Sequence, residues 1–272
     1  MNRIDMLKEM GITPVWLPRR ARGVIAEPPV TIASVPEAAP LQLPQVPPRK
    51  SLGGKGSEDI ATVRRSQSGS PAGALADSAG DAEHAARIAR MDWPQLHEAV
   101  AGCQACALCK GRTNTVFGVG GQPADWMIIG EAPGQEEDRL GEPFVGQAGK
   151  LLDSMLAALE MKRNANVFIA NVLKCRPPAN RNPEPFEVAQ CSPHLIRQVE
   201  LVAPKVILLM GRFAVQSILQ TDASIASLRG RLHRYRDIPA VVTYHPAYLL
   251  RNLPDKAKAW EDLLFARSVL AS

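Results

Sequence analysis

The sequence predicts an α/β fold, a three-layer α/β/α sandwich with a short central parallel sheet, over residues 89–272. Four short apolar runs recur along this region, and segments with the apolar spacing of helices separate them. The runs are continuously apolar instead of alternating, which is typical of strands buried on both faces. Parallel strands also need long crossover connections, and helices usually supply them. These observations together favour a parallel sheet covered by helices on both sides.

The expected strands are residues 126–129, 167–170, 206–210 and 241–243. A helix is expected between the first two strands, because apolar residues recur at positions 151, 152, 155, 156 and 159. The next two expected helices are residues 185–202 and 213–219. Each of the three helices lies between two strands in chain order, as a parallel arrangement requires.

Polar residues follow three of the four expected strands. Glu131 comes directly after the first strand and its glycine, Asn171 follows the second, and His245 follows the last. Ligands of open α/β sheets bind at the carboxyl ends of the strands. We therefore expect an acid, a carboxamide and an imidazole to meet in one crevice.

The chain contains five cysteines, and four of them form an asymmetric pattern. Cys103 and Cys106 lie close together in a loop-like segment, whereas Cys175 and Cys191 come far downstream. Thiolates from separate segments are typical ligands of an iron-sulfur cluster or a zinc ion. Cys109 competes with Cys106 for one ligand position, although the leucine before it favours packing. A disulfide framework is not expected, because no secretory leader is evident.

The amino-terminal part of the chain has a different composition. Residues 23–88 are rich in proline, glycine, serine and alanine, so we expect a disordered linker there. Residues 1–22 are instead apolar and aromatic, with Leu7, Met10 and Trp16 ahead of several arginines. A peptide of this kind, separated by a linker from the folded region, is predicted to bind another protein.

Charge and hydropathy narrow the class of protein. The formal net charge of +5 fits a phosphate-rich partner, although this signal is nonspecific. No segment approaches the ~20 apolar residues of a membrane-spanning helix. We therefore expect a cytoplasmic, monomeric protein with no membrane contact.

Four motifs carry a resemblance to a known family: Gly130-Glu-Ala-Pro-Gly-Gln-Glu-Glu-Asp138, Pro143-Phe-Val-Gly146, Asn171-Val-Leu-Lys-Cys-Arg-Pro-Pro178 and His245-Pro-Ala-Tyr-Leu-Leu-Arg-Asn252. Together they closely resemble the motifs of the family 4 uracil-DNA glycosylases, the iron-sulfur branch of that superfamily. The resemblance runs from Cys103 to Leu264, with the motifs in the same order and at similar spacing.

The resemblance implies a uracil-DNA glycosylase-like fold and an enzyme that flips uracil out of DNA and hydrolyses its N-glycosidic bond. The product would be an abasic site. The resemblance further implies a [4Fe-4S] cluster on Cys103, Cys106, Cys175 and Cys191. It also implies a uracil pocket at the strand ends, formed by Gly130, Glu131, Ala132, Glu137, Phe144, Asn171 and His245.

The chemistry of these residues agrees with that reading. The carboxamide of Asn171 can donate to O4 and accept from N3–H of uracil, whereas cytosine presents the reversed pattern. Phe144 is expected to stack on the base, and the small residues Gly130 and Ala132 permit close approach. His245 is expected to hydrogen-bond O2 as negative charge gathers on the departing uracil.

The residue that activates the attacking water is harder to identify from the sequence. Ala132 occupies the place where better-known relatives carry an aspartate, so Glu131 is the expected activating carboxylate. Glu137 is expected to crowd C5 of the base and exclude thymine. Leu249 and Arg251 are expected to contact DNA, with an apolar wedge filling the vacated stack.

Two other classes of function are weighed. One is a metal-stapled nucleic-acid-binding module without catalysis, but phosphate binding alone would not require Asn171 together with His245. The other is a zinc hydrolase, and four cysteine ligands would leave that metal no open position for water.

Residues 6–16 resemble the short segment with which the psi subunit of the bacterial replicative polymerase clamp-loader assembly contacts its chi partner. The resemblance implies that residues 1–22 bind the chi subunit. Trp16 would be the anchor, because buried aromatic residues carry much of the binding energy at interfaces.

Overall fold

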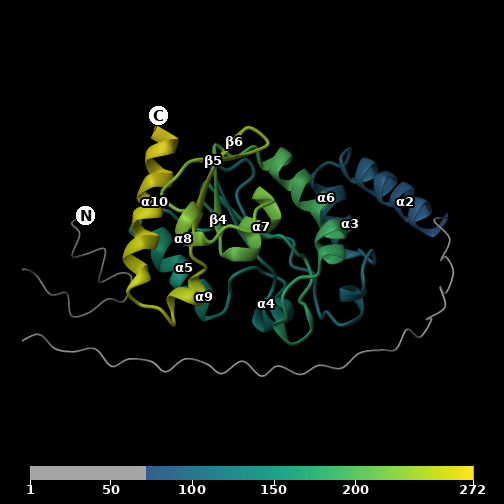
Figure 1. Cartoon of the computed structure of the whole chain (residues 1–272), viewed down its shortest axis with the longest axis horizontal. Coiled ribbons are helices and arrows are strands. Elements are labelled where there is room, and N and C mark those ends of the chain that lie inside the picture. The colour runs from purple at the N-terminus through teal and green to yellow at the C-terminus, as the bar shows by residue number, and fades with distance from the viewer. Residues whose placement is uncertain (1–71, 272) are drawn as a thin grey trace, which may run out of the picture. The chain divides into compact units, whose positions relative to one another are not determined.

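The computed structural model describes residues 72–271, with side chains from residue 80 onward (Figure 1). The predicted partner-binding peptide, residues 1–22, and residues 23–71 of the predicted linker lie outside the described residues. Both assignments stay predictions from the sequence.

A six-stranded sheet forms the centre of the described part, with the order β1-β3-β2-β4-β6-β5. The strands are β1 (Val119–Gly120), β2 (Trp126–Gly130), β3 (Val167–Asn171), β4 (Val206–Met210), β5 (His233–Tyr235) and β6 (Ile238–Thr243). The four inner strands are parallel, whereas β1 and β5 pair antiparallel at the two edges. The carboxyl ends of the inner strands therefore meet at one edge of the sheet.

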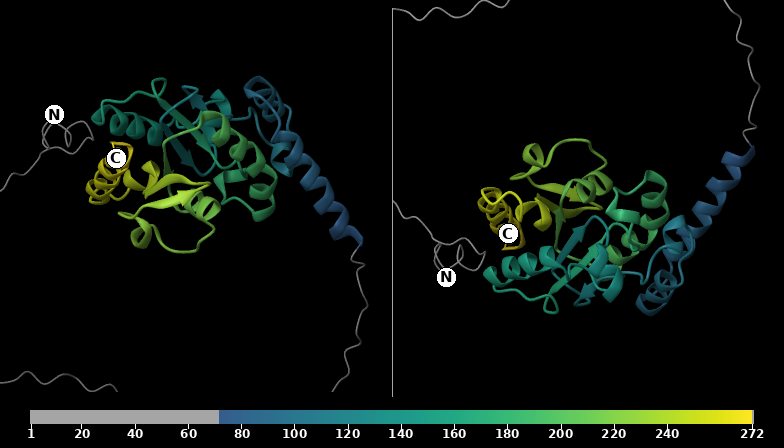
Figure 2. Two further views of the ribbon diagram at one scale, coloured as in Figure 1. Left: turned by 90° about the horizontal axis from the view of Figure 1, so that it is seen from above. Right: turned by 90° about the horizontal axis from the view of Figure 1, so that it is seen from below.

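Helices cover both faces of the sheet (Figures 1 and 2). On one face, α5 (Gln147–Ala158) and α10 (Asp255–Ala271) pack on inner-strand side chains such as Ile128 and Leu208. On the other face, α3 (Trp93–Ala101), α6 (Pro185–Val202) and α7 (Arg212–Leu219) pack on Ile129 and Leu209. Successive strand residues point to opposite faces, so the inner strands contribute side chains to the hydrophobic cores on both sides of the sheet. The predicted three-layer α/β/α class is confirmed.

The predicted elements agree closely with the observed ones. All four predicted strands are present, and the predicted helix 185–202 coincides with α6. The pattern did not predict α10, because charged residues surround this helix and its buried face includes Lys256 and Asp262. Edge strands β1 and β5 are only two and three residues long, too short for a periodic signal.

The disorder predicted for residues 23–88 is wrong at its carboxyl end, where α2 (Ala72–Ile88) is helical. Ile88 is fully buried, and the side chain of Gln190 in α6 donates a 2.6 Å hydrogen bond to Asp81. Alanine has the highest helix propensity, and α6 supplies a packing surface that the local sequence does not reveal. The folded region therefore begins before residue 89.

The remaining short helices lie in the loops around the sheet. They are η1 (Ala107–Lys110), α4 (Gln135–Leu140), η2 (Pro178–Asn180), α8 (Ile225–Leu228) and α9 (Pro246–Leu249). Among the helices of residues 72–271, none has both the length and the apolar character needed to cross a membrane.

Candidate active site and cysteine cavity

A cleft of about 500 Å³ opens at the carboxyl ends of the inner strands. Its lining includes seven of the residues that the sequence predicted for the site: Glu131, Ala132, Glu137, Phe144, Asn171, His245 and Arg251. They meet there because the strands run in register, with Gly130 opposite Asn171 and Met210 opposite Thr243.

Asn171 ends β3 and is 2% exposed. Gly130, at the end of β2, pairs with Asn171 and, although predicted for the pocket, is not in the lining of the cleft. A Cβ on Gly130 would come within 2.4 Å of Asn171 Oδ1 and 2.6 Å of the Phe144 ring. Only glycine therefore lets the carboxamide and the aromatic ring meet at this point.

Phe144 forms one wall of the cleft in a strained backbone conformation, with φ of 55°. Its ring is stacked with the imidazole of His245, with the centroids 5.4 Å apart and the planes at 27°. Arg163 donates hydrogen bonds to the carbonyls of Pro143, at 2.6 Å, and of Phe144. Positive φ at a non-glycine residue costs about 1–3 kcal/mol, and these contacts hold the ring there despite that cost.

Glu137 fixes the loop that carries Phe144. Its carboxylate accepts hydrogen bonds from the backbone N–H groups of Gly134 at 3.1 Å, Val145 at 3.0 Å and Gly146 at 3.1 Å. These bonds join the start of α4 to the loop. The Glu137 side chain also lines the cleft, as predicted.

His245 is the N-cap of α9, and its Nδ1 accepts a 3.2 Å hydrogen bond from the N–H of Ala247. Burial lowers the pKa of His245 to about 4. The imidazole is therefore neutral near pH 7, and this hydrogen-bond pattern assigns its proton to Nε2. Gly211, with φ of 92°, makes room, since a Cβ there would lie 2.9 Å from the Cβ of His245.

The pKa of Glu131 shifts in the opposite direction to that of His245. Burial raises the pKa of its carboxyl to about 7, and the positive charge of Arg212 partly opposes that rise. The group can therefore gain or lose a proton near neutral pH. Ala132 follows it in the cleft wall and adds no carboxylate at that position.

The predicted DNA contact of Leu249 is wrong. Its side chain is fully buried in the core cluster shared with α5 and α10. The single turn of α9 directs Leu249 inward, and Leu250 and Leu253 are the exposed leucines nearby, at 42% and 57%. Arg251 lines the cleft, and its predicted contact with DNA stays a prediction.

The loop between β3 and α6 supplies cleft residues that the sequence reasoning missed, namely Asn180, Arg181 and Asn182. Ala179 and Asn180 both have positive φ, which turns the loop sharply. Arg181 donates two hydrogen bonds to Glu187, at 2.9 and 2.6 Å, and these hold the loop against α6. In the sequence, the only local sign of a functional loop was the polar run Asn-Arg-Asn between Pro178 and Pro183.

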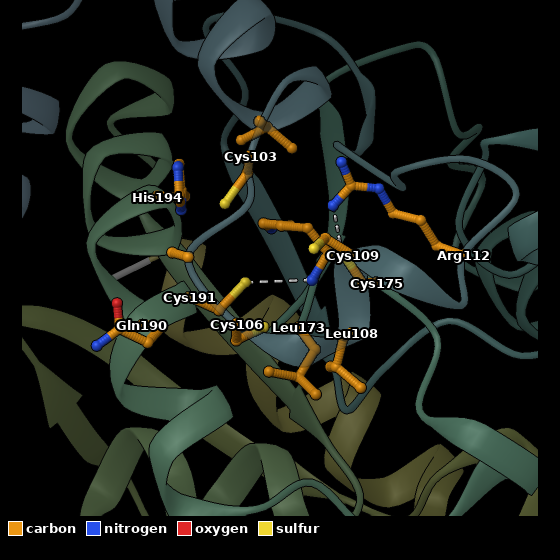
Figure 3. Close-up of a pocket in the computed structure, with 13 residues that line it drawn as sticks. Cys103, Cys106, Leu108, Cys109, Arg112, Leu173, Cys175, Gln190, Cys191 and His194 are labelled. Atoms are coloured by element: carbon orange, nitrogen blue, oxygen red, sulfur yellow. Dashed lines mark hydrogen bonds between the residues drawn. The ribbon is translucent and has the colours of Figure 1, made fainter.

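All five cysteines line a second, small cavity of about 20 Å³, and Figure 3 shows them gathered around one space. They are Cys103, Cys106, Cys109, Cys175 and Cys191. Burial raises the pKa of the Cys106 and Cys175 thiols and raises that of Cys191 to about 12. Arg112 Nη1 donates to Cys175 Sγ at 3.2 Å, and the Lys174 N–H donates to Cys191 Sγ at 3.3 Å.

This donor set fits a metal centre bound by thiolates. Buried thiols with N–H donors directed at sulfur are the usual surroundings of such a centre. Within residues 72–271, however, no three metal-binding side chains form a closed ligand group. The cavity brings the four predicted ligands together, and it also brings in Cys109, which the sequence left as an alternative to Cys106.

The fold and the cleft define an α/β protein with its cleft at the carboxyl ends of the parallel strands, where proteins of this class bind their ligands. A family model described as the uracil DNA glycosylase superfamily matches residues 117–264, and the chain belongs to this superfamily. Cys175 and Cys191 lie within the matched residues, whereas Cys103 and Cys106 precede them.

Three curated relatives are named Type-4 uracil-DNA glycosylase. The Archaeoglobus fulgidus protein is 44% identical over 159 residues, which are 56% of this chain and 79% of the relative. The Sulfurisphaera tokodaii protein is 42% identical over 62% of this chain and 80% of the relative. The Thermotoga maritima protein is 40% identical over 64% of this chain and 93% of the relative.

The substitution Gly149→Ala tests the packing behind Phe144. A Cβ at this position of α5 would lie 1.6 Å from the carbonyl oxygen of Phe144, so the loop or the helix must move. We expect urea denaturation to show a loss of about 1–3 kcal/mol in the free energy of unfolding. The control Gly111→Ala, with no atom within 4 Å of the added Cβ, should change by less than about 0.5 kcal/mol. Equal stability of the two variants would contradict the described contact.

Proposed function

We propose that this chain removes uracil from DNA with the cleft described above, and that Asn171, Phe144, His245 and Glu131 carry the reaction. Membership of the superfamily, together with the relatives named Type-4 uracil-DNA glycosylase, supports a uracil-DNA glycosylase, a hydrolase of N-glycosyl bonds that acts in base excision repair. The observation that supports the residue assignment is the neutral His245 donor and the buried Asn171 carboxamide in one cleft.

Recognition begins when the nucleotide leaves the duplex, because its glycosidic bond is out of reach within stacked DNA. The ring of Phe144 offers a stacking surface for the freed base. Asn171 pairs with O4 and N3–H of uracil, and a buried carboxamide of this kind penalises a base with the reversed pattern.

His245 assists departure of the base. As the glycosidic bond breaks, negative charge gathers on uracil O2, and the Nε2–H of the imidazole donates a hydrogen bond to it. Because Nδ1 is already an acceptor for the Ala247 N–H, this donor is oriented before the reaction starts. A preorganised donor of this kind is worth about 10²–10³ in rate.

Glu131 orients the water that replaces the base. Its carboxylate accepts a hydrogen bond from that water when it is ionised, and its position in the cleft wall favours this role over that of the clamped Glu137. Arg251, also in the lining, is the proposed contact with the DNA backbone.

The cysteine cavity is the proposed site of a [4Fe-4S] cluster, with Cys103, Cys106, Cys175 and Cys191 as ligands. When bound, the cluster supplies a structural cross-link between the loop after α3, the segment after β3, and α6. Arg112 and the Lys174 N–H donate to two of the sulfurs.

The chi subunit of the replicative polymerase is the proposed partner of residues 1–22. This proposal rests on the sequence resemblance alone, and the peptide lies outside the described residues. A tethered peptide would raise the effective concentration of the enzyme near replicating DNA.

Asn171→Ala and His245→Ala test the two central assignments in single-turnover excision from a uracil-containing oligonucleotide, with abasic sites revealed by alkali. We expect Asn171→Ala to lower the rate by about 10² or more. We expect His245→Ala to lower it by about 10²–10³ while DNA affinity changes much less. The control Asn164→Ala alters an exposed residue outside the cleft. Rates near wild type for both test variants would remove these residues from the site.

The pH dependence of excision tests Glu131. Its carboxyl has a pKa of about 7 and is ionised above that pH, whereas His245, with a pKa of about 4, stays neutral throughout. The single-turnover rate should therefore fall about tenfold as the pH drops from about 8 to about 6. Glu131→Gln should be slow and should lose this dependence. A pH-independent wild-type rate would contradict the role of the carboxylate.

Iron analysis tests the cysteine assignment. Protein purified without oxygen should be brown, with about four irons per chain and a broad absorption near ~400 nm. Cys175→Ser should lose the colour and much of the stability, because metal binding contributes to folding. Cys109→Ser should keep both and so distinguishes Cys109 from Cys106. A colourless, active protein with stoichiometric zinc would rule out the cluster.

A further inference from the structure

Lys174 is a fully buried lysine between the cleft and the cysteine cavity. Its Nζ donates hydrogen bonds to the backbone carbonyl of Asn171 at 2.8 Å and to Gln198 Oε1 at 2.6 Å. The Gln198 amide in turn donates to the carbonyl of Phe117 at 2.8 Å. The ammonium therefore joins the end of β3 to α6 through contacts of charge-assisted length.

The same residue belongs to the wall of the cysteine cavity. Its backbone N–H donates to Cys191 Sγ, and the next residue in the chain is Cys175. Only two residues separate Lys174 from Asn171, so one short segment contacts both sites. The side chain turns back to the carbonyl of Asn171, whereas the backbone N–H faces Cys191 Sγ.

A buried ammonium is costly unless hydrogen bonds and a negative charge compensate it. The two acceptors of Nζ are neutral oxygens. The sulfurs of Cys175, the next residue, and of Cys191, which accepts from the Lys174 N–H, are the groups that would supply negative charge when they bind a metal. Thiolates that hold a metal cluster carry this charge permanently, so a bound cluster and the ammonium would stabilise each other.

We infer that Lys174 is a positioning residue for uracil recognition, which couples the cysteine centre to Asn171 by holding the carbonyl at the end of β3. The inference rests on the proposed function of both sites. With the ammonium in place, the backbone of Asn171 is fixed, and its carboxamide meets the base in one orientation. Without it, the carboxamide samples orientations that do not match uracil.

A double-mutant cycle between Lys174 and Asn171 tests this role on the intact, iron-loaded chain. Lys174→Met keeps the length of the side chain and removes its charge and donors. We expect it to lower single-turnover excision about 10- to 100-fold in the wild-type background. In the Asn171→Ala background the same change should cost less than about threefold, because the carboxamide it positions is gone. Full, multiplicative losses in both backgrounds would overturn the inference, as would a Lys174→Met enzyme of wild-type rate.

Iron release provides a readout that does not depend on excision. Loss of the compensating ammonium should speed transfer of iron to a chelator about tenfold. The matched control is Lys256→Met, which removes a buried lysine from α10, and its release rate should equal that of wild type. Release from Lys174→Met at the wild-type rate would overturn the coupling to the cysteine centre.

Lys174→Met with Gln198→Met covers the case in which the single variant does not fold. The pair removes the ammonium together with the acceptor that it would leave unpaired, so the space stays filled. It should show the same slow excision and fast iron release, and wild-type values for both would overturn the inference. Failure of the proposed function is distinct, because the wild-type protein would then release no uracil.

Discussion

The parallel alignment of β3, β2, β4 and β6 is the constraint on which the rest of this structure depends. Because these strands run in the same direction, the residues that follow them emerge at one edge, and segments far apart in the chain become neighbours. The resulting crowding is severe. It is relieved at two strand ends by glycines, Gly130 beside Asn171 and Gly211 beside His245, where even one added carbon would overlap a neighbouring side chain.

Burial at this edge sets the electrostatics of the cleft. The same loss of solvent lowers the pKa of His245 and raises that of Glu131, because in each case the charged form is disfavoured. In the proposed reaction, the two pKa shifts serve different chemistry. A neutral imidazole donates to a developing anion without carrying a charge of its own, whereas a carboxyl that ionises near neutral pH can interact with water. One desolvated cleft thus supplies both a donor and an acceptor.

The cleft and the cysteine cavity are two ends of one stretch of chain. Asn171 and Cys175 are four positions apart, and the segment that follows Cys175 forms a wall of the cleft before α6 brings Cys191 back to the cavity. A centre that binds both cysteines would therefore anchor this wall at its two ends. The buried Lys174 joins the same two regions from inside the core, through Asn171 and Gln198. In the proposed function, this short-range anchoring would let the cysteine centre influence a site that it does not touch.

The sequence by itself determined the inner strands, the helix α6, the set of strand-end residues and the set of cysteines. These features follow from local patterns: continuous apolar runs demand burial on both faces, and their order specifies what emerges at the strand ends. Only the tertiary structure decided that Leu249 is a core residue, that residues 72–88 are helical and that Glu137 clamps a loop. The first two outcomes depend on a packing surface contributed by a distant segment, and the third depends on backbone donors in the loop that follows α4. A local pattern shows that a side chain favours burial or a hydrogen bond, but the partner that satisfies it exists only once the chain has folded.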